Sequence, residues 1–234
     1  MTNQEHISTR LSEWSPTDRR ATPKALVGGL VFFLGFVGII LAGQLNDVPL
    51  PLPGSAEVKV YAYFREQTLA VVTNAVLQGV SALGLIIFLS AVIPRLARIS
   101  RTAGVRLCRI LGVAAVLSLV LSALTSVALA VLASQLGAGT VATLQQVGFV
   151  LGGVTHVVIL GALIWSLART GNWAVAIRRF GVAAAVPAVL SVLSVVLFPA
   201  SVLLPLGRVL CMVWSISAGT SLLRGRSLPA RGSV

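Results

Sequence analysis

The chain has 234 residues, of which 56% are hydrophobic and only 10% are charged, and its mean hydropathy is +0.96. One soluble core cannot bury that much apolar surface, so the composition excludes a soluble globular protein and indicates an integral membrane protein. The formal charge of +12 raises the question of nucleic acid, but the basic residues cluster in short segments between apolar runs, which is typical of membrane topology. We therefore expect no nucleic-acid partner.

Residues 1–24 are polar and mixed in charge, and they predict a disordered cytoplasmic tail that ends at the helix-start signal Thr22-Pro23. The uncharged run 25–43 follows, and as a helix it covers about 28 Å, which is enough to cross the hydrocarbon core. A cleaved signal peptide is the alternative. The run is longer than the apolar part of a signal peptide and the tail before it is long, so we favour a first membrane span.

The next segment, 44–67, is polar and rich in proline, which favours an extended path. Ser55 is expected to cap a short amphipathic helix that leads into the second span. The aromatic residues of this helix are expected to form a belt at the outer headgroup level, and a ligand-binding lid is the alternative; they are Tyr61, Tyr63 and Phe64.

Five further apolar runs predict five further spans. Residues 110–168 contain no Asp, Glu, Lys or Arg, and we divide this stretch at the Gly137–Thr140 turn. Pro187 is expected to kink the fifth span. Trp165 and Trp173 are expected as interface anchors beside a basic turn that holds Arg169, Arg178 and Arg179. The predicted spans are 69–93, 110–133, 145–167, 180–198 and 206–223, and a basic tail, 225–234, follows the membrane domain 25–224.

The arginine-rich turn 94–109 (PRLARISRTAGVRLCR) determines the orientation, because it contains five arginines and no acid and such turns remain in the cytoplasm. Of the 18 lysines and arginines, only Lys59, Arg65 and Arg208 then fall in segments on the outer side. We predict an all-α bundle of six transmembrane helices in the plasma (inner) membrane, with both termini cytoplasmic. Its basic face is expected to contact anionic lipid.

Polar residues inside the spans are the candidate site. His156 lies in the middle of the predicted fourth span, where an ionisable side chain is costly and suggests a function. Amide and hydroxyl side chains recur on one face of the second span. The predicted solute-binding or cavity residues are Asn74, Gln78, Ser81, Ser122, His156 and Trp214.

The alternative for these residues is structural, since amides and hydroxyls bond across helices at about 0.6–2 kcal/mol each. Small residues suited to close helix packing occur four apart at Gly148/Gly152, Gly38/Ala42 and Ala75/Gly79. Arg208 is expected to reach the headgroups or to pair with Glu57 or Glu66 in preference to binding an anionic solute. The outer-face candidates are Glu57, Tyr61, Arg65 and Arg208.

The sequence argues against an enzyme. Every acid lies at or before Glu66, and there is no metal-ligand motif and no nucleophile-base pattern that the membrane domain could assemble. We expect no cofactor and no metal. Cys108 and Cys211 fall near opposite ends of their spans, so no disulfide is expected.

Three segments carry a resemblance to a known family: AEVKVYAYFREQ before the second span, IPRLARISR after it, and SLARTGNWAVAIRRFG before the fifth. On these segments, residues 55–224 resemble the uncharacterised six-helix integral membrane proteins that are common in actinobacteria and are assigned to a domain of unknown function. The resemblance implies the six-helix fold and implies no activity.

Two functions remain open. The first is a small transporter or solute-binding membrane protein that uses the polar residues near mid-depth. The second is a membrane scaffold or sensor that acts through its basic cytoplasmic face, with a protein partner or a second copy of the chain. A wet path along the polar residues favours the first, and a tightly packed interior favours the second.

Overall fold

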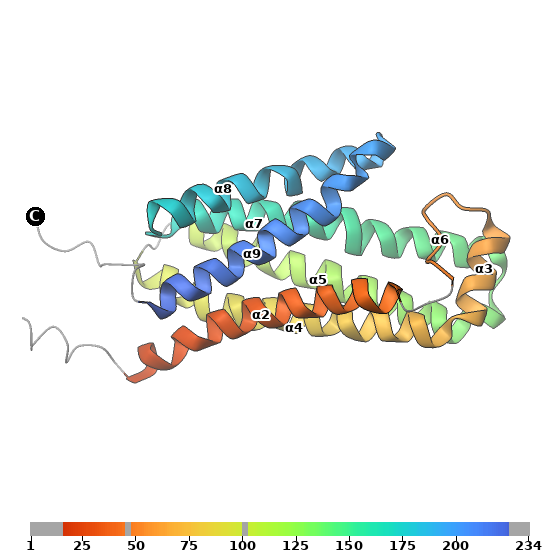
Figure 1. Cartoon of the computed structure of the whole chain (residues 1–234), viewed down its shortest axis with the longest axis horizontal. Coiled ribbons are helices and arrows are strands. Elements are labelled where there is room, and N and C mark those ends of the chain that lie inside the picture. Colours follow the sequence, from red (N-terminus) through yellow and green to blue (C-terminus); the bar gives the residue numbers. More distant parts are fainter. Residues whose placement is uncertain (1–15, 45–47, 100–102, 225–234) are drawn as a thin grey trace, which may run out of the picture.

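The computed structural model describes residues 16–44, 48–99 and 103–224. All regular elements in these ranges are helical, and six helical segments among them are long and apolar enough to cross a membrane. The chain is therefore an all-α polytopic membrane bundle, as the sequence predicts (Figure 1).

Each span is one helix or a continuous series of helices. The first three are α2 (Pro16–Gln44), α4 (Thr68–Ile99) and α5 (Ala103–Leu132), and α5 ends in the 3₁₀ turn η1 (Ala133–Gln135). The fourth contains α6 (Ala138–Phe149), the π-helical segment η2 (Val150–Thr155) and α7 (His156–Thr170). The last two are α8 (Val175–Leu190) and α9 (Leu203–Leu223), which are joined by the 3₁₀ segments η3 (Ser191–Val195) and η4 (Phe198–Val202). The short helix α3 (Glu57–Glu66) lies between the first two spans.

The helix boundaries differ from the sequence-based ones at most spans; α5, for example, begins at Ala103 and not at 110, and α8 ends at Leu190 and not at 198. α2 begins at Pro16, so residues 16–24 are helical and the prediction of disorder there is wrong. Pro16 takes the first helical position, where proline is well tolerated. Residues 1–15 and the basic tail 225–234 lie outside the described residues. The cap of α3 is Ala56 and not Ser55. Pro187 lies inside α8, which gives way to 3₁₀ geometry four residues later, at Ser191.

The six spans form a closed ring in which each packs against the next and α9 returns to α2. Successive spans run in opposite directions, so the start of α2 and the end of α9 lie at one end of the bundle (Figure 1). We call this the basic end, because it also holds the α4–α5 and α7–α8 connections with their arginines. The opposite end, where α3 and α6 lie, is the α3 end.

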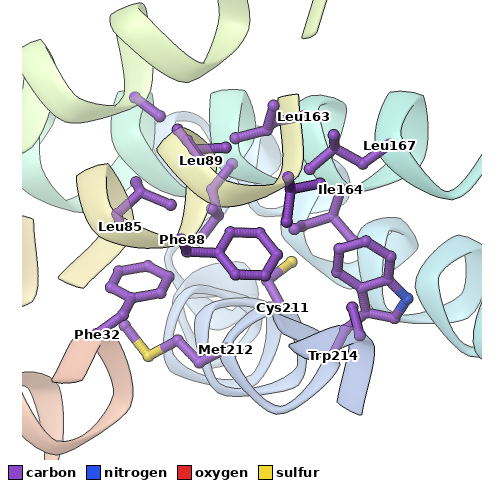
Figure 2. Packing of buried hydrophobic residues seen from close by; sticks show 14 of the residues in the cluster. Phe32, Leu85, Phe88, Leu89, Leu163, Ile164, Leu167, Cys211, Met212 and Trp214 are labelled. Atoms are coloured by element: carbon purple, nitrogen blue, oxygen red, sulfur yellow. The ribbon is translucent and has the colours of Figure 1, made fainter. Parts of the chain in front are cut away.

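The interior near the basic end is tightly packed. Phe88 lies between Phe32 and Trp214, and aliphatic side chains from α4 and α7 surround the three rings (Figure 2). The Trp214 indole N–H donates to the Ile177 carbonyl at 2.9 Å. Cys108 and Cys211 are both free and buried.

Trp173 belongs to this core and is not an interface anchor. Its side chain is only 6% exposed, and its ring packs edge-on against Trp214 with 5.6 Å between centroids. The indole N–H donates to the Leu167 carbonyl at 2.8 Å, in the last turn of α7, where helix carbonyls lack partners within the helix. Trp165 is partly exposed, with the Arg169 guanidinium over its ring, as an anchor would be.

Glycines set the close contact between α2 and α4. A Cβ at Gly28 would lie 2.3 Å from the Phe88 backbone nitrogen, and a Cβ at Gly84 would lie 2.2 Å from the Phe32 backbone nitrogen. Neither glycine was among the expected small-residue pairs. Gly79, which was, has nothing within 4 Å of the position of a Cβ.

Candidate functional site

A half-open cavity of about 520 Å³ lies between the helices at the α3 end. Most of its wall is apolar or aromatic, with contributions from α2, α3, α4, α5, α6, α7 and α9. Among the residues that line it are Phe36, Tyr63, Phe64, Leu129, Phe149 and Val157. Its polar lining includes Asn74, Gln78, Ser122, Thr125, Ser126, Gln145, Ser194, Ser201 and Arg208.

The helix α3 and the loop 50–53 cover the cavity. Tyr63 and Phe64 are 3% and 4% exposed and face inward, so the expectation that they form an aromatic belt is wrong. The physical reason is that α3 packs on α6 and buries this face. Burial also raises the pKa of the Tyr63 phenol. The alternative prediction for this helix, a lid over a ligand site, agrees better with its position over the cavity.

Gln145 fastens the loop to the bundle. Its side-chain N–H donates to the Pro51 carbonyl at 2.7 Å, and the side chain is 8% exposed. The sequence analysis missed this residue, because a glutamine at the start of a span resembles any interfacial polar residue. The proline-rich loop 49–53 offered a signal, since a proline segment leaves backbone carbonyls without helical partners.

Two of the predicted residues form a hydrogen-bonded chain across three helices. The Gln78 amide donates to the Ser122 hydroxyl oxygen at 3.2 Å, and that hydroxyl donates to the Gly148 carbonyl at 2.8 Å. The chain thus joins α4, α5 and α6. Gln78 and Ser122 both line the cavity and hold the helices together. The cavity interpretation and the structural interpretation of these residues therefore both apply.

Gly152, in η2, makes room for this chain. A Cβ there would lie 2.2 Å from the Ser122 hydroxyl oxygen and 2.8 Å from the Gln78 amide nitrogen. The wider turn of a π-helix occurs in the same segment, and such segments are frequent at functional sites. The glycines of the pair Gly148/Gly152 therefore make room for side chains of the cavity wall.

Arg208 faces the cavity, and the expectation that it reaches the headgroups or pairs with Glu57 or Glu66 is wrong. One of its terminal N–H groups donates to the Gly152 carbonyl, and its guanidinium lies over the Phe36 ring at 5.1 Å from the centroid. Its Nε is buried and has no hydrogen-bond partner among the described residues. The direction of this side chain results from the approach of α9 to η2, which the sequence does not reveal.

Asn74 is the third predicted residue in the cavity wall, one helical turn from Gln78 toward α3. Its amide oxygen is buried and has no hydrogen-bond partner in the described part of the chain. Because this oxygen is closed off, only the rest of the Asn74 side chain faces the cavity.

His156 lies outside the cavity wall. The ring is fully buried, with 0% exposure, and its Nδ1 donates to the Ala115 carbonyl of α5 at 2.8 Å. Its edge faces the Phe32 ring, with 6.4 Å between the centroids. The histidine connects α7 to α5 within the packed core.

Ser81 and Trp214 likewise belong to the core. The Ser81 hydroxyl donates to the Phe32 carbonyl at 2.9 Å, and Trp214 packs against Phe88. Of the six residues predicted as one cluster, the structure brings together Asn74, Gln78 and Ser122 around the cavity. It places Ser81, His156 and Trp214 elsewhere.

The other outer-face candidates lie on α3, away from the cavity interior. The Arg65 guanidinium lies over the Tyr61 ring at 5.6 Å from the centroid. Glu57 is exposed, and its carboxylate faces the start of α6 near Gly139. These three residues do not form one site with Arg208.

No family model, curated protein or solved structure matches the chain. The resemblance to a six-helix family thus stays a prediction, and function must be argued from the cavity itself.

Proposed function

We propose that this membrane protein binds a small solute in the cavity at the α3 end. The observation that carries the proposal is a cavity of about 520 Å³ with a mostly apolar wall and a few polar groups. Ligand sites in proteins have volumes of about 300–1,000 Å³ and the same composition. The Asn74 and Gln78 amides and the Arg208 guanidinium are the polar groups of that wall closest in kind to a solute-binding set.

The orientation follows from the positive-inside rule, and we propose it on that ground. The basic end carries most of the arginines of the described chain, so it belongs in the cytoplasm and the α3 end belongs outside. The solute then enters from the outer side, past α3 and the loop 50–53.

Binding is favoured over transport. Transport requires access from both sides in turn, and the core around Phe88 and Trp214 stands between the cavity and the basic end. A transport cycle therefore needs those packed side chains to separate, whereas solute binding needs no such change.

Cysteine labelling tests the proposal. In a background with Cys108→Ser and Cys211→Ser, single cysteines replace Gln78, in the cavity wall, and Ser81, on the core side of the same helix. A water-soluble, membrane-impermeant thiol reagent is added to intact cells. We expect label at position 78 and none at 81, and none at 156 in His156→Cys.

An unlabelled position 78, or equal labelling at 78 and 81, contradicts the proposal. Labelling at position 78 only in inverted vesicles contradicts the proposed orientation and still supports an accessible cavity. The two parts of the proposal are thus tested separately.

A second candidate function is that of a scaffold that binds anionic lipid at the basic end. The observation that favours it is a hollow of about 500 Å³ beside the α7–α8 turn, which Arg169, Arg178 and Arg179 line. Replacing these three arginines with glutamine should reduce the anionic lipid that copurifies with the protein and leave labelling at position 78 unchanged. Unchanged lipid content contradicts this candidate.

A further inference from the structure

The charge of Arg208 is the starting point. The Arg208 side chain is only partly exposed, and a largely desolvated charge without a counter-ion is costly, so such charges in proteins are normally paired. Among the residues that line the cavity in the described part of the chain there is no Asp or Glu. The guanidinium thus faces the cavity with its charge uncompensated by any described residue.

The position of the guanidinium is fixed by two contacts. The Gly152 carbonyl accepts from one terminal nitrogen, and the Phe36 ring supports the planar group from one side. A guanidinium has five N–H donors, and the Gly152 carbonyl takes one from a terminal nitrogen, so terminal donors remain for a ligand, whereas the Nε is closed off inside the protein. A carboxylate or a phosphate matches such a planar donor set in a bidentate manner.

The remaining wall determines the rest of the ligand. Aromatic and aliphatic side chains cover most of it, among them Phe64, Leu129 and Phe149. Apolar surface favours an apolar ligand body over a small hydrated ion. The Asn74 side chain adds a polar group to this wall.

We infer that the ligand is an amphipathic anion, a carboxylate or phosphate group on an apolar chain, whose acid group pairs with Arg208. This inference rests on the proposed solute binding and specifies its chemistry. A cation is disfavoured by the same charge, and a neutral amphiphile leaves the guanidinium without a counter-ion.

The test uses four amphiphiles with one chain length: octanoate, octyl phosphate, octanol and octyltrimethylammonium. The full-length protein with its single cysteine at position 78 is reconstituted in phosphatidylcholine vesicles, and each amphiphile is titrated against labelling by a neutral maleimide. We expect octanoate, octyl phosphate or both to protect the cysteine at concentrations at least about tenfold lower than octanol or the cation. The preferred headgroup distinguishes a carboxylate from a phosphate ligand.

Variants identify the charge responsible. Arg208→Gln should weaken protection by the preferred anion about tenfold or more and leave protection by octanol unchanged. Arg65→Gln removes an arginine outside the cavity and should change neither. Arg208→Lys keeps the charge and loses the planar donor set, so it should give an intermediate affinity, and it also serves if the glutamine variant does not fold.

Three results would overturn the inference without contradicting solute binding. Octanol could protect as well as the anions, the Arg208→Gln variant could bind the anion unchanged, or none of the four amphiphiles could protect a cysteine that labels. Stronger anion protection in Asp47→Asn would also overturn it, because Arg208 would then have a counter-ion within the chain; Asp47 lies outside the described residues. If position 78 does not label at all, the proposed function itself fails.

Discussion

The two ends of the bundle are built from the same helices and differ in how they are filled. α4 contributes Leu85 and Phe88 to the core near the basic end, and Asn74 and Gln78 to the cavity near α3. In lipid, helices associate through close packing and through hydrogen bonds between them. Both ends contain hydrogen bonds between helices, but the core is closed where glycines let the α2 and α4 backbones approach, and the α3 end stays hollow where Gln78 and Ser122 bridge the helices.

Truncation of one aromatic side chain at each end should give the largest contrast. Trp214→Ala removes a fully buried ring and its hydrogen bond to Ile177, and we expect it to lower the free energy of unfolding by about 3–5 kcal/mol. Phe149→Ala removes a partly exposed ring of the cavity wall and should cost less than about 1 kcal/mol. Unfolding in SDS, followed by circular dichroism, measures both, and equal losses would contradict the contrast.

The close contact of α2 and α4 can be broken by one methyl group. Gly84→Ala places a Cβ against the Phe32 backbone, which cannot move as a side chain can, and should cost about 1–3 kcal/mol. Gly79→Ala on the same helix meets nothing within 4 Å and should be neutral or slightly stabilising. Thermal unfolding in detergent tests the pair. If Gly79→Ala destabilises as much as Gly84→Ala, the assignment of the packed face is wrong.

A methyl group in η2 should alter the cavity more than the fold. Gly152→Ala displaces the Gln78 amide and the Ser122 hydroxyl, which can rotate, and also meets the Ser122 Cβ at 2.7 Å, which cannot, so we expect a loss of about 1–2 kcal/mol with a changed labelling rate at position 126. Position 126 carries the single cysteine in a Ser126→Cys background, so the Gln78–Ser122 pair stays intact before the substitution. Gly153→Ala next to it makes ordinary contacts with Phe149 and serves as the control. The same labelling rate in both variants would show that Gly152 is not needed for the cavity wall.

Release of the loop over the cavity should have the smallest effect on stability. Gln145→Leu removes the hydrogen bond to the Pro51 carbonyl and should cost about 1 kcal/mol. Its clearer result should be faster labelling of the cysteine at position 78, since the cover is loosened. The control is Gln146→Leu, which changes the exposed neighbouring residue. We expect no change in the labelling rate at position 78 in this variant. Unchanged labelling in Gln145→Leu would mean that the loop does not limit access.

The sequence by itself determined the six spans, the gathering of arginines at one end and the short helix before the second span. These features depend on local hydropathy and charge, which a stretch of chain carries wherever it packs. Helix ends were less well predicted, as in α2, where the helix continues through Pro23 to Pro16. A proline removes only one backbone hydrogen bond, and its effect depends on the residues around it.

Only the tertiary structure decided which polar side chains face the cavity. Gln78 and Ser81 lie three residues apart on one helix, yet the first lines the cavity and the second bonds to Phe32 in the core. The π-helical η2 adds a residue to its turn, which rotates the faces of the next helix, α7, by about 100°. His156 is the first residue of α7 and packs on α5, away from the cavity. Arg208 meets the Gly152 carbonyl only because α9 passes beside η2, and no local pattern in the sequence records such an approach.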